Sequence, residues 1–184
     1  MKKAYIFLAD GFEESEALIT VDLLRRGSVD CRMVSVSGRD EVTGRSGITV
    51  LCDLKFEDAD FGNTDALIVP GGMPGTTHLK EHQGVGEQLK AAAESGKLVA
   101  AVCAGPTVLG ALGILEGKKA TCYPGCESGL LGATVLEAEA VVDGNIITSR
   151  GVGTTIPFAL AILEKLTDKA NADKVAAGIV YTGK

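Results

Sequence analysis

Short apolar segments alternate with segments of helical length along most of this chain, and this alternation constrains its fold more than any other feature. The segments that predict strands are residues 3–8, 31–36, 48–51, 65–70 and 98–102. The segments that predict helices are residues 18–26, 85–94, 106–112, 156–166 and 173–181. Because strands that alternate with helices form βαβ units, we expect an α/β fold, with a mostly parallel sheet and helices on both faces.

The later part of the chain contains a hairpin signal. Residues 139–142 and 145–148 are short apolar segments, and Asp143-Gly144 between them is typical of a two-residue turn. No linker, repeat or low-complexity stretch divides the chain, so we expect residues 1–184 to form a single domain.

Composition and charge narrow the range of partners. The net charge is −6 and aromatic residues make up only 4% of the chain, which argues against a nucleic acid as the main partner. No apolar run reaches the roughly 18 residues that a membrane span needs. Acidic residues follow the first apolar segment at once, which argues against a signal peptide. We therefore expect a cytoplasmic protein without a membrane partner.

The five cysteines lie at positions 31, 52, 103, 122 and 126. The closest pair, Cys122 and Cys126, has no second pair and no histidine beside it, so the spacing argues against a zinc site. Most of the five are expected to pack as small apolar side chains.

Three segments directly follow predicted strands: residues 10–16, 70–75 and 103–106. Ligands of open parallel sheets bind beyond the carboxyl ends of the strands. We therefore expect these three segments to lie on one rim of the sheet.

Cys103 ends the strand that is predicted to be most deeply buried. Ala101 and Gly105 are the small neighbours that a sharp strand-to-helix turn around a nucleophile requires. A helix N-terminus at that position would lower the pKa of the thiol. A buried structural cysteine has the same local pattern, so the pattern alone leaves a reactive and a structural role equally open.

The groups that could assist a thiol are two histidines and a cluster of acids. His78 and His82 have helical spacing, but two ligands alone argue against a metal site, and a solvated helix start is favoured. Glu13, Glu14 and Glu16 lie on the expected rim, although the first turn of any helix also favours acids. No histidine adjoins Cys103, which argues against a Cys-His hydrolase.

Two glycine-rich loops have alternative interpretations. Gly71-Gly72 is either a simple turn or a set of backbone N–H groups that holds an oxyanion. Residues 148–155 contain Gly151 and Gly153 but lack the third glycine and the acid of a dinucleotide site. We expect Arg150 in this loop to form a structural ion pair.

Several segments together resemble a known family: "ADGFEESEAL", "VDLLRRG", "DALIVPGG", "AAVCAGP" and "TSRGVGTTIPFALAILE". They resemble the ThiJ/PfpI superfamily, in the branch of the Parkinson-disease protein deglycase, and the resemblance covers almost the whole chain. It implies a flavodoxin-like three-layer sandwich, a homodimer, and no metal or organic cofactor.

The resemblance also implies roles for single residues. Cys103 matches the reactive cysteine, and Glu16 matches the glutamate that lies against it. Gly71, Gly72 and Ala104 match the backbone positions that hold an oxyanion.

Two further positions, Asp22 and Arg26, match a structural acid and base on the first helix. Tyr123 stands where several members carry a histidine, which leaves Glu16 as the one proton shuttle and Tyr123 as an accessory group. Ala104 stands where the protease-like branch has a histidine, so protease activity is not expected.

Two functions follow from a reactive Cys103 paired with Glu16. In the first, Cys103 is a thiolate, Glu16 is protonated, and the thiolate attacks the aldehyde of methylglyoxal or the carbonyl of an early glycation adduct on an amine or thiol. This describes a cofactor-free glyoxalase or protein deglycase. In the second, Cys103 is oxidised to a sulfinate in a redox-sensing, chaperone-like stress protein. A scaffold with a vestigial site is a third interpretation.

Overall fold

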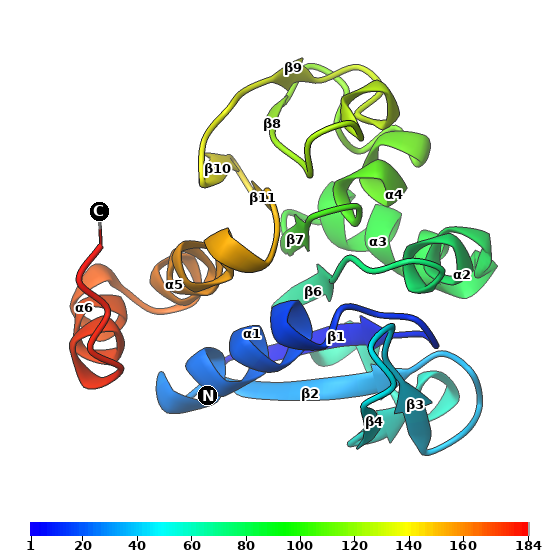
Figure 1. The fold of residues 1–184 in the computed structure, drawn as a ribbon, viewed down its shortest axis with the longest axis horizontal. Coiled ribbons are helices and arrows are strands. Elements are labelled where there is room, and N and C mark those ends of the chain that lie inside the picture. Colours follow the sequence, from blue (N-terminus) through cyan, green and yellow to red (C-terminus); the bar gives the residue numbers. More distant parts are fainter. Residues whose placement is uncertain (184) are drawn as a thin grey trace.

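The computed structural model describes residues 1–183, in which seven strands form one central sheet (Figure 1). In chain order they are β1 (Lys3–Leu8), β2 (Asp30–Ser35), β5 (Leu54–Lys55), β6 (Ala66–Val69), β7 (Leu98–Val102), β10 (Ala140–Asp143) and β11 (Ile146–Ser149). Their order across the sheet is β10-β11-β7-β6-β1-β2-β5, and every neighbouring pair except β10–β11 is parallel. The predicted α/β fold with a mostly parallel sheet is therefore confirmed.

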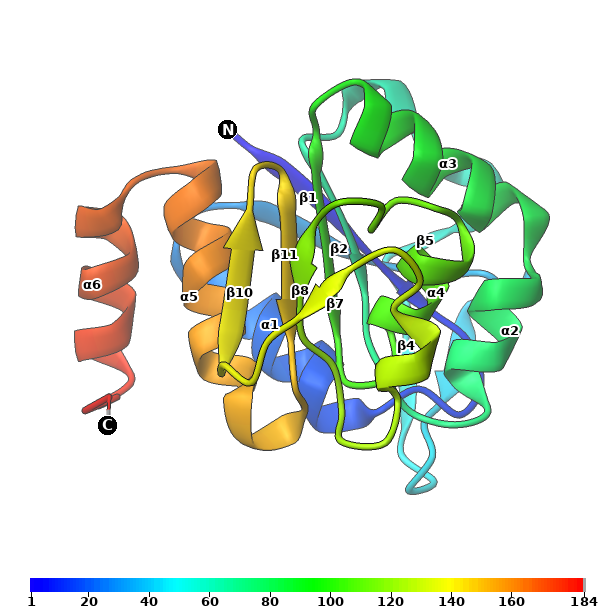
Figure 2. The same ribbon diagram turned by 90° about the horizontal axis from the view of Figure 1, so that it is seen from above.

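Helices cover both faces of this sheet. They are α1 (Glu14–Arg26), α2 (Gly75–Glu81), α3 (Gln83–Glu94), α4 (Pro106–Ala111), α5 (Thr155–Leu166) and α6 (Lys169–Gly178). Helices α1 and α5 pack together on one face, with α6 outside α5, whereas α2, α3 and α4 cover the other face (Figures 1 and 2). The result is a three-layer α/β/α sandwich.

The alternation of side chains along β1 shows how the two faces are filled. Ile6 and Leu8 belong to the core cluster beneath α1 and α5, whereas Tyr5 and Phe7 belong to the cluster beneath α2, α3 and α4. Successive side chains of a strand point to opposite faces, so a continuous apolar run suits a strand that is covered on both sides.

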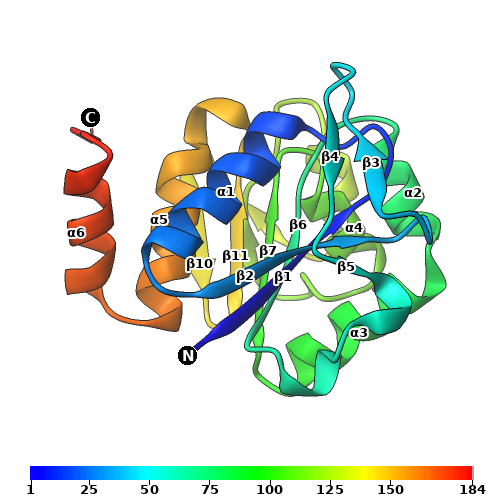
Figure 3. The ribbon, with the colours of Figure 1, turned by 90° about the horizontal axis from the view of Figure 1, so that it is seen from below.

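Short elements complete the fold. They are β3 (Glu41–Thr43), β4 (Thr49–Leu51), β8 (Lys119–Ala120), β9 (Thr134–Val135) and the single-turn 3₁₀ helices η1 (Phe56–Asp58), η2 (Phe61–Asn63), η3 (Glu127–Gly129) and η4 (Val152–Thr154). Strands β3 and β4 form an antiparallel hairpin that projects from the body of the molecule (Figure 3). The hairpin predicted around Asp143-Gly144 is confirmed as β10 and β11, and Gly144 has a φ of +64°.

The first helix starts earlier than the apolar pattern predicted. It begins at Glu14 rather than Leu18, because Glu13 caps it: the side chain of Glu13 accepts a hydrogen bond from the backbone N–H of Ser15 at 3.4 Å. Near the other end of this helix, the predicted acid–base pair of Asp22 and Arg26 is an ion pair of 2.8 Å. Within residues 1–183, no helix has the length and apolar character that crossing a bilayer requires.

Candidate active site

Cys103 lies in the sharp turn between β7 and α4. It is half-buried and has a φ of +63°, a left-handed conformation that non-glycine residues rarely adopt. The turn is tight: a side chain at Gly105 would place its Cβ 2.6 Å from the carbonyl oxygen of Val69. The nucleophile elbow expected from the small neighbours is therefore present, and backbone strain at such a position is typical of functional sites.

Glu16 comes to this turn from the first turn of α1. Its side chain is only 1% exposed, and its Oε2 accepts a hydrogen bond of 2.8 Å from the backbone N–H of Gly71. Its other oxygen, Oε1, is buried and has no hydrogen-bond partner within the described residues. A buried carboxyl oxygen without a donor is costly when ionised, which favours a protonated Glu16.

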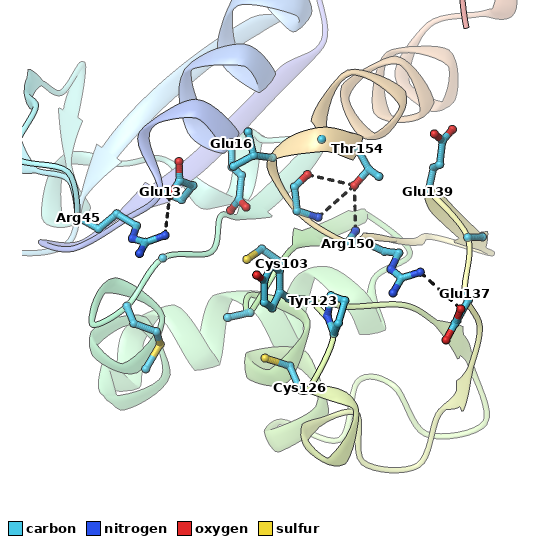
Figure 4. Close-up of a pocket in the computed structure, with 18 residues that line it drawn as sticks. Glu13, Glu16, Arg45, Cys103, Tyr123, Cys126, Glu137, Glu139, Arg150 and Thr154 are labelled. Atoms are coloured by element: carbon cyan, nitrogen blue, oxygen red, sulfur yellow. Dashed lines mark hydrogen bonds and ion pairs between the residues drawn. The ribbon is translucent and has the colours of Figure 1, made fainter. Parts of the chain in front are cut away.

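The thiol and the carboxyl meet above Gly71. A Cβ added at Gly71 would lie 2.7 Å from Oε2 of Glu16 and 2.9 Å from Sγ of Cys103. The missing side chain thus provides the space in which the carboxyl of Glu16 and the thiol of Cys103 approach each other, and the charge of Glu16 acts on the pKa of Cys103. The three segments expected on one rim do converge here (Figure 4).

Both acidic groups have raised pKa values. Burial raises the pKa of Glu16 to about 7, although the Gly71 N–H favours the carboxylate. Burial also raises the pKa of Cys103 to about 12, helped by the charge of Glu16 and opposed by the N–H groups of Ala104 and Gly72. The expectation that the helix N-terminus lowers the pKa of the thiol is therefore wrong, because α4 is short and desolvation outweighs its dipole.

Cys103 and Glu16 titrate as a dyad rather than as separate groups. Two adjacent anions repel each other, so the first proton leaves the dyad near pH 7 and the second near pH 12. Between these values the dyad carries one negative charge and one proton. Thiolate with carboxylic acid, and thiol with carboxylate, are the two forms of this singly protonated state.

The backbone positions proposed to hold an oxyanion have different roles. The N–H of Gly71 is already bonded to Glu16, so this residue positions the acid. The N–H groups of Gly72 and Ala104 instead favour the thiolate of Cys103 and oppose the rise of its pKa. Gly72 has a φ of +90°, and a Cβ there would lie 2.3 Å from the backbone nitrogen of Glu13, so only glycine fits.

Tyr123 lies at the mouth of the site. Its backbone N–H donates a 2.9 Å hydrogen bond to the carbonyl of Cys103, and its side chain is 53% exposed. Its ring lies against Gly151, where an added Cβ would be 3.4 Å from Cδ2 of Tyr123 and 3.8 Å from Oε1 of Glu16. Tyr123 thus occupies the position from which an accessory group would reach a bound molecule.

The dyad lies in a cavity of about 850 Å³. Two ion pairs flank it: Arg45 with Glu13 at 3.4 Å, and Arg150 with Glu137 at 3.8 Å (Figure 4). The expected ion pair of Arg150 is present, but the residue also lines the cavity. Arg45 was not predicted as a site residue, because it comes from the β3–β4 hairpin, whose position depends on long-range contacts.

The loop after β11 forms one wall of the cavity through Thr154. The Oγ1 of Thr154 accepts hydrogen bonds from the backbone N–H groups of Arg150 at 3.2 Å and Gly151 at 3.0 Å. The sequence of this loop argues against a dinucleotide role, and the loop was not expected at the site. Its position directly after a strand was the signal that could have done so.

The two histidines lie outside the cavity. His82 caps α3, because its Nδ1 accepts a 3.1 Å hydrogen bond from the backbone N–H of Val85, and its ring lies 4.7 Å from that of Phe56. His78 bonds to the backbone carbonyl of Asp10 at 3.0 Å. Within residues 1–183, no group of three His, Cys, Asp or Glu side chains is arranged to hold a metal ion.

A strained cysteine at a strand end, paired with a buried glutamic acid over a glycine loop, defines an α/β protein with a cysteine–carboxyl dyad. The chain belongs to the DJ-1/PfpI family, which matches residues 2–165. The structure superposes on one described as "Toxoplasma gondii DJ-1, oxidized" with a TM-score of 0.95 at 34% identity, and covers 100% of both chains.

Two curated relatives differ in length. The chain is 38% identical over 181 residues to "Protein DJ-1 homolog B" of Arabidopsis thaliana; these residues are 97% of this chain but 41% of that protein. The chain thus spans less than half of this relative. It is 36% identical over 168 residues to "Glutathione-independent glyoxalase DJR-1.2" of Caenorhabditis elegans, with 90% of this chain and 89% of that protein covered.

Proposed function

We propose that this protein is a cofactor-free glyoxalase or protein deglycase of the cytosol, which acts on methylglyoxal or on early glycation adducts. The observation that carries the proposal is the buried carboxyl of Glu16 beside the thiol of Cys103, in an open cavity. The name of the Caenorhabditis elegans relative supports it.

In the first step, the thiolate of Cys103 attacks the aldehyde carbon of methylglyoxal. The C=O π bond breaks, and its oxygen takes the proton of Glu16 to give a hemithioacetal. The N–H groups of Gly72 and Ala104, which adjoin the sulfur, stabilise the developing negative charge on oxygen.

In the second step, Glu16 is the general base and then the general acid. Its carboxylate removes the proton from the carbon bonded to sulfur, and returns it to the neighbouring carbon through an enediol, which leaves a lactoyl thioester. Water then hydrolyses the thioester, so that lactate and the Cys103 thiol are released. A pKa near 7 suits a group that both accepts and donates a proton at neutral pH.

The size of the cavity favours larger substrates as well. A volume of about 850 Å³ is within the range of pockets that hold drug-sized molecules, and methylglyoxal has only five non-hydrogen atoms. An adduct on an amine or thiol would place its carbonyl at Cys103 and its carrier along the walls that bear Arg45 and Arg150. This supports the deglycase form of the proposal.

The direct test is lactate formation from methylglyoxal by purified protein. Wild-type protein is expected to turn over, whereas Cys103→Ser and Glu16→Gln are expected to lose at least about 100-fold in kcat/KM, because each removes a group that takes part in covalent or proton transfer. Cys52→Ser is the matched control, since Cys52 is a partly buried cysteine that does not line the cavity. Wild-type turnover no faster than that of Cys103→Ser would refute the proposal.

A second function, redox sensing in a chaperone-like stress protein, is supported by the oxidised state named for the Toxoplasma gondii structure. Here a hydroperoxide oxidises Cys103 stepwise to a sulfinate, and protonated Glu16 donates a hydrogen bond to it. Intact-mass analysis after mild peroxide treatment tests this function. Oxidation spread evenly over the five cysteines would contradict it.

We also propose that the protein is a homodimer, as its family resemblance implies. The β3–β4 hairpin supports this, because Ile48 and Leu51 on it are 54% and 68% exposed. Sedimentation velocity should give a dimer for wild-type protein and a monomer for Leu51→Asp. A monomeric wild-type protein at micromolar concentration would exclude a stable dimer.

A further inference from the structure

Two of the five cysteines, Cys103 and Cys126, line the same cavity. Both are partly exposed, and Figure 4 shows both side chains among those that line the cavity. The other three do not line it: Cys31 and Cys122 are 1% and 3% exposed, and Cys52 follows the β3–β4 hairpin. An oxidant that enters the cavity therefore meets two thiols and no others.

The backbone ties Cys126 to the strained turn of Cys103 through Tyr123. The N–H of Tyr123 bonds to the carbonyl of Cys103 at 2.9 Å, and the N–H of Cys126 bonds to the carbonyl of Tyr123 at 3.0 Å. Cys126 is thus the last residue of a turn whose first residue is anchored beside the reactive thiol.

The tip of this turn is not crowded by neighbouring atoms. At its tip, Gly125 has a φ of +93°, and a Cβ added there would meet no atom within 4 Å. A disulfide requires the two Cα atoms to lie within roughly 7 Å of each other. Disulfide formation would therefore require the turn to move and to give up the hydrogen bond between Cys126 and Tyr123.

We propose that Cys126 is a resolving thiol for Cys103, and that the two form a reversible disulfide when the protein meets a hydroperoxide. The proposal rests on the proposed function only in that Cys103 is the reactive thiol. Cys126 has no part in the carbonyl chemistry proposed above.

The reaction has two steps. The thiolate of Cys103 attacks the peroxide and the O–O bond breaks; the leaving oxygen takes the proton of Glu16 and departs as an alcohol or water, which gives a sulfenic acid on Cys103. The sulfur of Cys126 then attacks the sulfur of Cys103; the hydroxyl group leaves and takes the proton of Cys126, so that one water and the disulfide form. Two equivalents of an external thiol reduce the disulfide and restore both cysteines.

The disulfide would take Cys103 out of carbonyl chemistry without destroying it. A sulfinate, in contrast, is not reduced by ordinary thiols. Because Tyr123 is bonded through its backbone to both Cys103 and Cys126, movement of the turn toward Cys103 would also move its ring over the dyad. The cavity is thus blocked in the oxidised form and reopens on reduction.

The test is intact-mass analysis and non-reducing peptide mapping after one equivalent of hydrogen peroxide. Wild-type protein should lose the mass of two hydrogen atoms, and the peptides that contain Cys103 and Cys126 should be joined; dithiothreitol should reverse both changes. Cys126→Ser should lack the disulfide, and its Cys103 should reach the sulfinate several-fold faster than in wild-type protein. Cys52→Ser, the matched control, should behave as wild-type protein does.

Two outcomes would overturn the proposal. One is a disulfide that joins Cys126 to Cys122 rather than to Cys103. The other is sulfinate formation at the same rate in wild-type protein and Cys126→Ser. Neither readout depends on lactate formation. A protein without glyoxalase activity could therefore still form the disulfide, and a protein that forms lactate could still lack the disulfide.

Discussion

The backbone N–H of Gly71 donates a 2.8 Å hydrogen bond to Oε2 of Glu16, while Oε1 of the same buried carboxyl has no partner among residues 1–183. One loop glycine therefore holds the acid in place and, having no side chain, leaves room for the sulfur of Cys103 beside it. A buried carboxyl with an unpartnered oxygen favours the protonated form of Glu16.

The rate of methylglyoxal turnover should rise with pH through a single ionisation near pH 7. The reactive state is the singly protonated dyad, which forms when the first proton leaves near the pKa of Glu16, about 7, and persists until Cys103 loses its proton near 12. The measurement is kcat/KM between pH 5 and 9.

Glu16→Gln provides the control for this profile. Without the charge of Glu16, one cause of the raised Cys103 pKa is removed, so the pKa of the thiol should fall below that of the wild-type protein. In this variant, the pH dependence of the alkylation rate of Cys103 should show the ionisation of the thiol alone. A pH profile near 7 that Glu16→Gln leaves unchanged would show that another group is responsible.

Folding stability should fall as pH rises from about 4.5 to about 7, because the pKa of Glu16 is raised from its ordinary value of 4.5 to about 7 in the folded state. Over this range the folded protein binds a proton that the unfolded chain has released, so the contribution of Glu16 is fully present below pH 4.5 and lost above pH 7. The loss amounts to about 3 kcal/mol.

Chemical denaturation at pH 5 and pH 8 measures this effect. Glu16→Gln should remove most of the difference between the two pH values and should be more stable than wild-type protein at pH 8. Equal pH dependence in both proteins would mean that Glu16 is ionised in the folded state at pH 5.

Gly71→Ala should abolish the site. The new methyl group would lie 2.6 Å from Cβ of Cys103 and 2.7 Å from Oε2 of Glu16, so the dyad must separate. We expect at least a tenfold loss of turnover and a destabilisation of about 1–3 kcal/mol from overpacking. Gly153→Ala is the matched control, since Gly153 lines the same cavity but a Cβ there meets no atom within 4 Å. Similar losses in both variants would contradict this reasoning.

Thr154→Val should loosen the wall of the cavity. The hydroxyl of Thr154 accepts two backbone hydrogen bonds, from Arg150 and Gly151, and an isosteric valine leaves both donors unpaired. The free energy of unfolding should fall by about 1–3 kcal/mol, and the KM for methylglyoxal should rise, because Gly151 lies against Glu16 and Tyr123. Thr154→Ser retains the hydroxyl and should behave as wild-type protein does in thermal melts and kinetics.

The strands of the main sheet could be predicted wherever they are covered on both faces. The sequences of β1, β6 and β7 are continuous apolar runs, because helices pack on both faces of these strands. β5, β8 and β9 were not predicted, since each has two residues and exists only through pairing with a distant partner. Helix α2 was not predicted as an element of its own, because it contains only seven residues.

In the site, the residues that follow strands could be predicted and those from other elements could not. Cys103 was expected at the elbow from its small neighbours alone, and Glu16 was expected on the same rim. Arg45, by contrast, enters from a hairpin, and Cys126 from a turn after a two-residue strand. No local periodicity marks either residue.

The sequence by itself determined the parallel sheet, the sharp turn at Cys103 and the rim on which the acids at 13–16, Gly71 and Gly72 gather, because hydrophobic period and residue size are local properties. Only the tertiary structure decided the state of the dyad. Desolvation and the contact with Glu16 raise the pKa of Cys103, against the lowering that a helix N-terminus predicts. The burial of a side chain depends on which distant segments of the chain cover it, so a local sequence pattern does not predict it.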